Sequence, residues 1–170
     1  MTLLPPPPGR EEVMVWRLDR DRHAADWDSG EGAYRLGGRW NSVGVRAVYC
    51  SLDPATAILE VAVHKTFGGL DTVPHVLTAA RLVHPADIFV VEPTSVPNPN
   101  WLHPGTPGAG QQRYGDALLA THLFVAIPSA VSRHSWNLVF DASRVRNRYT
   151  LAFQERFALD TRLNPPVALR

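Results

Sequence analysis

Residues 37–51 read GGRWNSVGVRAVYCS, a glycine-rich loop that runs directly into an apolar, β-branched segment. Ordinary turns use Gly, Asn and Pro, and they seldom need an Arg-Trp pair between the glycines and the asparagine. The loop therefore predicts that Arg39 and Asn41 contact a ligand, at a place where Gly38 lets the ligand approach the backbone closely. The run at 45–51 predicts a strand, because β-branched and aromatic residues dominate it.

A helix is predicted to follow this strand. The pair Asp53-Pro54 is typical of an N-cap and a first helical position, so the pattern indicates a helix over residues 54–67 that ends at the glycine pair 68–69. Most of its residues are apolar, which predicts burial on nearly all sides.

Glu60 interrupts this apolar helix. It lies at helical spacing from Thr56 and His64, at i, i+4 and i+8, so the three residues form one polar stripe. An unpaired buried carboxylate would be strongly destabilising or would become protonated. Glu60 must therefore pair with a cation or face a cleft, and the pattern alone leaves a structural ion pair and a catalytic role equally open.

The rest of the chain predicts one mixed α+β domain over residues 13–170, with an extended proline-rich tail at 1–12. We expect a long connection at 20–44, a proline-rich loop at 92–110 and a short helix at 111–122. Apolar and alternating segments predict further strands at 13–19, 75–83, 87–91, 123–131 and 135–141, and a closing strand at 150–160.

Composition narrows the functional classes. A length of 170 residues suits a single domain, and the net charge of +1 argues against a protein that binds nucleic acid by bulk electrostatics. The sequence shows neither a leader pattern nor an apolar stretch long enough for a membrane span, so we expect a cytoplasmic protein without membrane association. Cys50 predicts a buried structural thiol, and no histidine or cysteine spacing indicates a metal site.

Three further residues are candidates for the same site. Arg17 ends the first strand, and its side chain is expected on the face opposite to Trp16 and Leu18. Tyr34 is either a lid over the core or a platform for a flat ring. Ser129 follows a proline, a position more typical of a turn hydroxyl than of a nucleophile.

Two other functional classes remain open from the residues alone. The stretch SRVRNRY, with Arg144, Arg146 and Arg148, is either a small basic patch for RNA or solvated surface. A protein-interaction module is the third possibility.

Several segments, taken in order, resemble the RES domain, a family of bacterial toxins named for Arg, Glu and Ser that pair with an Xre-type antitoxin. The most specific part is GGRWN followed at this distance by a helix ending in LE. Asn137 departs from an expected N-x-L-x-N-P segment, whose end is replaced by Phe140-Asp141. The matching segments are WR at 16–17, GGRWNSVG, AVYCS, PATAILEVAVH, VAIPSAV and NLVFD.

This resemblance implies an ADP-ribosyltransferase-like fold, in which a split, mostly antiparallel sheet and a few helices surround an NAD cleft. It further implies the toxin of a type II toxin–antitoxin system that consumes NAD as a substrate by cleaving the nicotinamide–ribose bond, without a metal. The acceptor stays open between water, phosphate and a protein side chain, the last giving an ADP-ribosyltransferase. An Xre-type antitoxin is expected to cover the cleft and to provide the only link to nucleic acid.

The resemblance also implies roles for individual residues. By position, the catalytic residues are Arg17, Glu60 and Ser129, with Glu60 stabilising positive charge on the ribose and Ser129 orienting a ribose or carboxamide group. Arg17 and Arg39 are expected to hold the pyrophosphate, Tyr34 to stack on the nicotinamide or ribose, and Trp40 to turn inward as a packing anchor. The residues expected to line the NAD cleft are Tyr34, Gly38, Arg39, Asn41 and Tyr49.

Overall fold

A single seven-stranded sheet organises the chain, in the order β4-β5-β6-β2-β1-β3-β7. The computed structural model describes residues 12–103, 105 and 107–166, so nearly all of the expected tail at 1–12 lies outside the described residues. All neighbouring strands are antiparallel except β4 and β5, which confirms the predicted mixed α+β fold. The strands are β1 (Met14–Arg20), β2 (Ala47–Ser51), β3 (His75–Leu82), β4 (Ile88–Val90), β5 (Phe124–Pro128), β6 (Trp136–Asp141) and β7 (Tyr149–Phe157).

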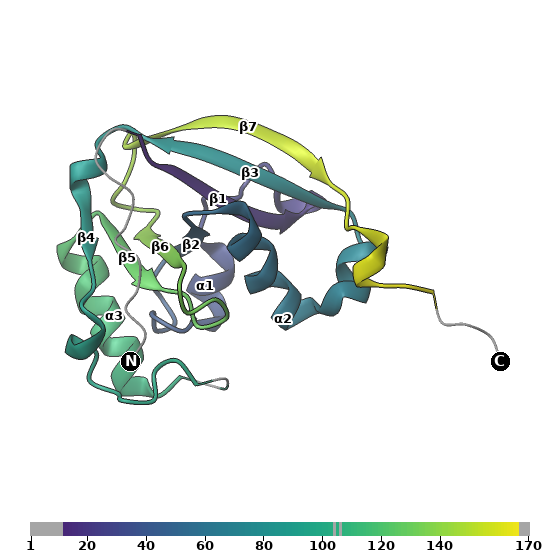
Figure 1. Ribbon diagram of the computed structural model, residues 1–170. Helices are drawn as coiled ribbons and strands as arrows, with labels where there is room; N and C mark the ends of the chain where they lie inside the picture. The colour runs from purple at the N-terminus through teal and green to yellow at the C-terminus, as the bar shows by residue number, and fades with distance from the viewer. Residues whose placement is uncertain (1–11, 104, 106, 167–170) are drawn as a thin grey trace.

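The sheet is nearly split between β1 and β2. These strands share one paired position, Trp16 with Ser51, whereas β1 and β3 pair from Met14 to Arg20 along their whole length. One half of the sheet therefore consists of β4, β5, β6 and β2, and the other of β1, β3 and β7. Figure 1 shows the long strands β1, β3 and β7 arching over the top, with β4, β5 and β6 to the left.

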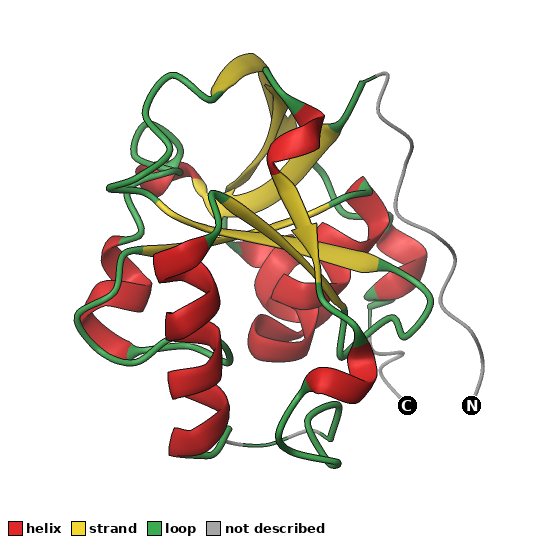
Figure 2. Cartoon of the chain, turned by 90° about the vertical axis from the view of Figure 1, so that its left-hand side faces the viewer, coloured by secondary structure: helices red, strands yellow, loops and turns green. Residues whose placement is uncertain are grey.

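Three α-helices pack around the two halves (Figure 2): α1 (Glu31–Leu36), α2 (Pro54–Thr72) and α3 (Ala109–Thr121). In Figure 1, α2 lies beneath β1 and β3, while α3 lies beside β4 and β5. Trp40, Leu119 and Ile127 belong to the apolar cluster on the α3 side, and Leu18 and Leu77 to the cluster under α2. In the described part of the chain, short 3-10 turns occur at Asp21–His23, Pro85–Asp87, Pro93–Ser95 and Thr161–Leu163.

Helix α1 lies inside the segment 20–44, which was expected to be a long connection. Its sequence carries a weak signal, because six residues are too few for an apolar period to be recognised. Ion pairs of Glu31 with Arg35, four residues on, and with Arg46 hold it in place. The second of these pairs depends on the tertiary fold.

Helix α2 differs from its prediction in two respects. It is not buried on nearly all sides: Leu59 and Val63 are 39% and 55% exposed, because the sheet covers one face of the helix only. It also continues past the predicted end at residue 67. The backbone leaves the helical region at Thr66 (φ 62°, ψ 161°) and then resumes, which brings Leu70 into the apolar cluster under the sheet.

Within the described ranges, no helix is long and apolar enough to cross a membrane.

Candidate active-site cleft

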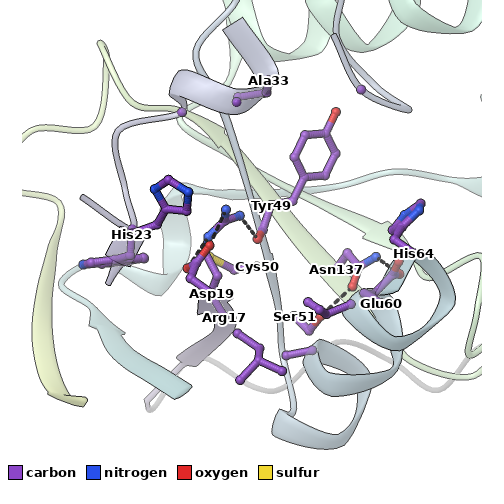
Figure 3. A pocket seen from close by; sticks show the side chains of 18 of the residues that line it. Arg17, Asp19, His23, Ala33, Tyr49, Cys50, Ser51, Glu60, His64 and Asn137 are labelled. Carbon is purple, nitrogen blue, oxygen red and sulfur yellow. Dashed lines mark hydrogen bonds and ion pairs between the residues drawn. The ribbon is translucent and has the colours of Figure 1, made fainter. Parts of the chain in front are cut away.

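A cleft of about 780 Å³ opens where β1 and β2 separate. Its size is within the usual range for small-molecule sites, roughly 300–1,000 Å³. The walls come from β1, β2, α1, α2, the 37–40 loop and the start of β6. Figure 3 shows side chains from these elements converging on one space, with Arg17 and Asp19 on one side and Glu60 on the other.

Glu60 reaches the cleft wall from the middle of α2. Its Oε1 accepts hydrogen bonds from the Ser129 hydroxyl at 2.8 Å and from the Asn137 amide at 2.5 Å. Among the described residues Glu60 forms no ion pair, and its Oε2 has no hydrogen-bond partner. Of the two interpretations left open by the sequence, the structural ion pair is therefore wrong, and Glu60 faces the cleft.

The start of α2 fixes the direction of this helix. The Asp53 carboxylate accepts from the Thr56 backbone N–H at 2.8 Å and from the Thr56 hydroxyl at 2.6 Å, which confirms the predicted N-cap. The three residues of the polar stripe therefore have different structural roles. Thr56 is buried and belongs to the cap, whereas Glu60 and His64 line the cleft.

Ser129 supports Glu60 from behind rather than lining the cleft. Its side chain is fully buried, and its hydroxyl also accepts from the backbone N–H groups of Val131 at 3.2 Å and Ser132 at 3.0 Å. It is therefore both the turn hydroxyl that its position after proline indicates and the donor that orients Glu60. The turn ends β5 at Pro128, earlier than predicted.

Asn137 is the second donor to Glu60, and it is itself held in place. It lies opposite Ser51 in the pairing of β2 and β6, and its Oδ1 accepts from the Ser51 hydroxyl at 2.8 Å. In the sequence, Asn137 stands out only as a departure from a family pattern, and Ser51 carries no predicted role. The available signal was Ser51 at the end of an apolar strand and Asn137 between Trp136 and Leu138.

Arg17 bridges the two halves of the sheet. Its Nε and Nη2 donate to both carboxylate oxygens of Asp19 at 2.8 and 2.9 Å, and its Nη1 donates to the Tyr49 carbonyl on β2 at 2.8 Å. Burial is the largest single influence and lowers the pKa of Arg17, but the attractions of Asp19, Cys50 and Asp28 together outweigh it, so the pKa lies above the ordinary value. The guanidinium thus replaces ladder hydrogen bonds where β1 and β2 diverge (Figure 3).

Arg39 and Trp40 join the glycine loop to the rest of the cleft wall. Arg39 lines the cleft, and its Nη1 donates to the Trp101 carbonyl at 2.9 Å, which attaches the loop to the proline-rich segment. Trp40 is buried against the rings of Trp101 and Tyr114, which confirms that it is an inward packing anchor.

The structure places Asn41 within the fold, outside the set of residues that line the cleft. Its side chain is completely buried outside the cleft lining, donates to the Ala33 and Val45 carbonyls, and accepts from the Tyr49 hydroxyl at 2.6 Å. Burial raises the pKa of Tyr49, which keeps this hydroxyl protonated as the donor. Tyr49 and Gly38 do line the cleft, but a Cβ at Gly38 would lie 2.6 Å from the Tyr49 hydroxyl oxygen, so packing already requires this glycine.

Tyr34 also lies outside the set of residues that line the cleft. It is 40% exposed, and the Arg46 guanidinium carbon sits 4.5 Å above its ring. Helix α1 turns Ala33 and Leu36 toward the cleft instead. The short helix, which was absent from the predicted elements, determines this rotation.

Cys50 is buried in the core beside the cleft, as predicted. Burial raises the pKa of its thiol to about 12, so it is an unsuitable nucleophile near neutral pH. Within the part of the chain that the structure describes, no three His, Cys, Asp or Glu side chains are grouped so as to hold a metal ion.

The cleft also contains residues that the sequence analysis did not assign to it. They are polar or basic side chains from the end of β1, the turn after it, α2 and the start of β3. Their scattered positions gave no motif, and the fold alone brings them together. These residues are Asp19, Arg20, Arg22, His23, Lys65 and His75.

Known proteins resemble this chain both in sequence and in fold. A Pseudomonas putida protein named "Toxin Res" is 28% identical over 152 residues, which cover 89% of this chain and 99% of that protein. A Sphingobium protein named "Prs ADP-ribosylating toxin" is 47% identical over 57 residues, 32% of this chain. That match and one to a Photorhabdus laumondii "Toxin Res" span only 35% and 33% of those relatives' lengths.

A solved structure, the Mycobacterium tuberculosis MbcT–MbcA toxin–antitoxin complex, contains a chain that superimposes with a TM-score of 0.72 at 21% identity, covering 88% of this chain and 86% of that one. The match establishes a shared fold. The family profile described as the RES domain matches residues 14–160. Because that match includes every strand of the sheet and the whole cleft, the chain belongs to the RES domain family.

Proposed function

We propose that this protein is the toxin of a toxin–antitoxin system and consumes NAD by cleaving the bond between nicotinamide and ribose. The observation that carries the proposal is Glu60, a carboxylate on the cleft wall that two neutral donors orient and that no cation among the described residues neutralises. The names of relatives as toxins, one of them ADP-ribosylating, support it.

The chemistry follows from the charge that develops during cleavage. The electron pair of the C1′–N bond leaves with nicotinamide, and positive charge builds on the ribose ring, as in glycoside cleavage. The free Oε2 of Glu60 faces this charge and can accept a ribose hydroxyl, while Ser129 and Asn137 hold Oε1. A carboxylate oriented before the reaction stabilises such a transition state strongly, because it does not reorganise.

The acceptor that attacks C1′ then loses a proton and determines the enzyme class. Water gives a glycohydrolase, inorganic phosphate a phosphorylase, and a protein side chain an ADP-ribosyltransferase. We keep all three, and the product distinguishes them. We also propose that an antitoxin of the Xre type binds over the cleft mouth and blocks entry of NAD.

The fold does not support nucleic-acid binding by the three arginines at 144, 146 and 148, because two of them are engaged by the protein itself. Arg144 donates to the Leu119 and His122 carbonyls, and Arg148 pairs with Asp87 at 3.3 Å. Only Arg146 of the three arginines has no such contact among the described residues, so they do not form a continuous basic patch.

The test is incubation of the purified protein with NAD, with and without inorganic phosphate, followed by chromatography of the products. We expect nicotinamide release from the wild type and a decrease of at least about 100-fold in Glu60→Gln. Glu155→Gln on the exposed strand β7 is the matched control and should retain wild-type activity. Undiminished turnover by a folded Glu60→Gln variant would refute the assignment.

A further inference from the structure

Three of the arginines that line the cleft are already engaged by the protein. Arg17 is held by Asp19, Arg35 by Glu31, and Arg39 by carbonyls of the proline-rich segment. A diphosphate entering the cleft would have to compete with a carboxylate for the first two. Other cations in the same cleft are therefore better placed to bind it.

Arg20 and Lys65 are two such cations. Both line the cleft, and neither forms an ion pair or a side-chain hydrogen bond with any described residue. Arg20 ends β1, and Lys65 immediately precedes the backbone break in α2.

The strand register places Arg20 and Lys65 at the same end of the cleft. Helix α2 begins just after Ser51, which pairs with Trp16, and ends just before His75, which pairs with Arg20. The helix therefore runs in the same direction as β1.

The apolar cluster under α2 supports this placement. Leu18 and Val61 belong to that cluster. Arg20 follows Leu18 by two residues on the same face of β1, and Lys65 follows Val61 by one helical turn. Both cations thus lie one step beyond the cluster, toward the end of the groove between β1 and α2.

His75 adds a third polar group at this end. Its side chain is 2% exposed, lines the cleft and lies directly opposite Arg20 in the pairing of β1 and β3. Its Nδ1 lies 2.6 Å from the Val73 carbonyl, which can only accept, so Nδ1 carries a proton, and in the neutral ring Nε2 is an acceptor. Nε2 has no partner among the described residues, an arrangement that is rare for a buried polar atom.

We propose that Arg20, Lys65 and His75 form a subsite for a sugar phosphate. The two cations bind phosphate oxygens, and Nε2 of His75 accepts a hydrogen bond from an adjacent sugar hydroxyl. Lys65 follows Glu60 by five residues, about 7.5 Å along the helix axis at 1.5 Å per residue. Because both side chains also line the same cleft, this rise along the axis is compatible with a ribose at Glu60 and its diphosphate at Lys65. The inference rests on the NAD-cleaving function proposed above and assigns the ADP portion of the substrate to this end of the cleft.

The test uses ADP-ribose, ADP and adenosine as probes in calorimetric titrations of the wild type, Arg20→Gln and Lys65→Met. We expect each variant to bind ADP and ADP-ribose about tenfold more weakly, which corresponds to the loss of one charge-assisted contact. Binding of adenosine, which has no phosphate, should be unchanged. Arg156→Gln on β7, which removes one positive charge away from the cleft, is the matched control. Wild-type affinity for ADP in both cleft variants would overturn the proposal.

His75 and the source of the phosphate are tested separately. If the His75→Phe variant folds, we expect it to bind ADP-ribose several-fold more weakly. The Arg20→Gln and Lys65→Met variants test the subsite whether or not His75→Phe folds. Displacement of ADP by inorganic phosphate in the wild type, lost in Lys65→Met, would support a subsite that also admits free phosphate. Displacement that is equal in both proteins would contradict it.

These titrations need no cleavage, so their outcome can be separated from that of the proposed function. If the variants lose ADP affinity but the wild type leaves NAD intact, the subsite stands and the activity is refuted. If the variants consume NAD with an unchanged KM, the activity stands and the subsite is refuted.

Discussion

Glu60 illustrates how neutral neighbours can orient a carboxylate without neutralising it. An arginine partner would neutralise the carboxylate and weaken its electrostatic stabilisation of a developing cation. The Ser129 hydroxyl and the Asn137 amide instead orient one carboxylate oxygen without neutralising the negative charge. Both donors are in turn held by neighbouring groups: Ser129 by two backbone N–H groups, and Asn137 by Ser51. The orientation of Glu60 therefore depends on residues that do not line the cleft as well as on residues that do.

Removing the Ser129 hydroxyl tests this dependence. We expect Ser129→Ala to lower kcat for NAD loss by about 10- to 100-fold with a smaller change in KM, because a displaced catalytic group loses its alignment with the transition state. The variant should also lose roughly 1–3 kcal/mol of stability, since two backbone N–H groups lose their acceptor. Steady-state kinetics and urea denaturation measure the two effects.

Ser132→Ala is the control for that variant, because the Ser132 hydroxyl bonds Ser135 in the same turn and does not contact Glu60. Equal kinetic losses in the two variants would show that the turn as a whole, and not the contact with Glu60, is responsible.

The Cys50 thiol offers a second measurement on a single residue. Its pKa of about 12 lies above the ordinary thiol value, so the folded protein holds it neutral where the unfolded chain would ionise it. The contribution to stability is complete below the unfolded pKa and is lost as the pH rises through that range toward 12. We expect no alkylation of the folded protein at pH 8 and rapid alkylation in denaturant, followed by mass spectrometry. Fast labelling without denaturant would contradict the burial.

At the scale of elements, α2 combines Glu60, the proposed catalytic carboxylate, with a backbone irregularity. Thr66 occupies a region of backbone conformation (φ 62°, ψ 161°) that is nearly restricted to glycine and costs a β-branched residue of order 1–3 kcal/mol. The break follows Lys65 directly and redirects the end of the helix toward the apolar cluster. Local strain is thus located beside the proposed phosphate subsite.

Glycine at this position should relieve the strain. We expect Thr66→Gly to raise the free energy of unfolding by about 1 kcal/mol, after the greater flexibility of glycine in the unfolded chain is included. Thr72→Gly, at the end of the same helix in helical conformation, should instead destabilise by up to about 1 kcal/mol. Urea titrations of both variants decide the sign. The Thr66 hydroxyl accepts a weak hydrogen bond from the Gly69 N–H at 3.3 Å, so destabilisation by Thr66→Gly larger than the loss of that bond would show that the irregularity is not strained.

At the scale of the whole molecule, the separation of the two half-sheets creates the cleft. A single paired position joins β1 to β2, and the Arg17 guanidinium spans the opening from Asp19 to the Tyr49 carbonyl. This assignment gives Arg17 a role in holding the cleft walls together, in addition to any contact with substrate. It also explains why its charge is less available to a phosphate than that of Arg20.

Asp19→Ala tests this connection. Without the carboxylate, the partly buried Arg17 loses its ion pair, and we expect a loss of roughly 1–3 kcal/mol of stability together with faster amide exchange at the ends of β1 and β2. Glu12→Ala, which removes the exposed ion pair with Arg81, should cost at most about 1 kcal/mol. Similar losses in the two variants would mean that Arg17 does not join the half-sheets.

The sequence by itself determined the elements whose signals are local. Strand composition identified β1, β2, β3 and β6, and the Asp53-Pro54 pair identified the start of α2. The helical spacing of Thr56, Glu60 and His64 identified a polar stripe, and the carboxylate at its centre does face a cleft. These features depend on residues within one or two turns of each other, so their physical causes lie within the stretch that shows them.

Only the tertiary structure decided which polar groups face the cleft and which are used to build it. The side chain of Asn41 forms hydrogen bonds inside the fold. Tyr34 is turned outward by a helix that is too short to be recognised from sequence, and Ser129 lies behind Glu60. Arg20, Lys65 and His75 come together through the pairing of β1 with β3 and the packing of α2. Residue type sets what a side chain can bind, but strand register and helix rotation set what it can reach, and these depend on contacts between distant segments.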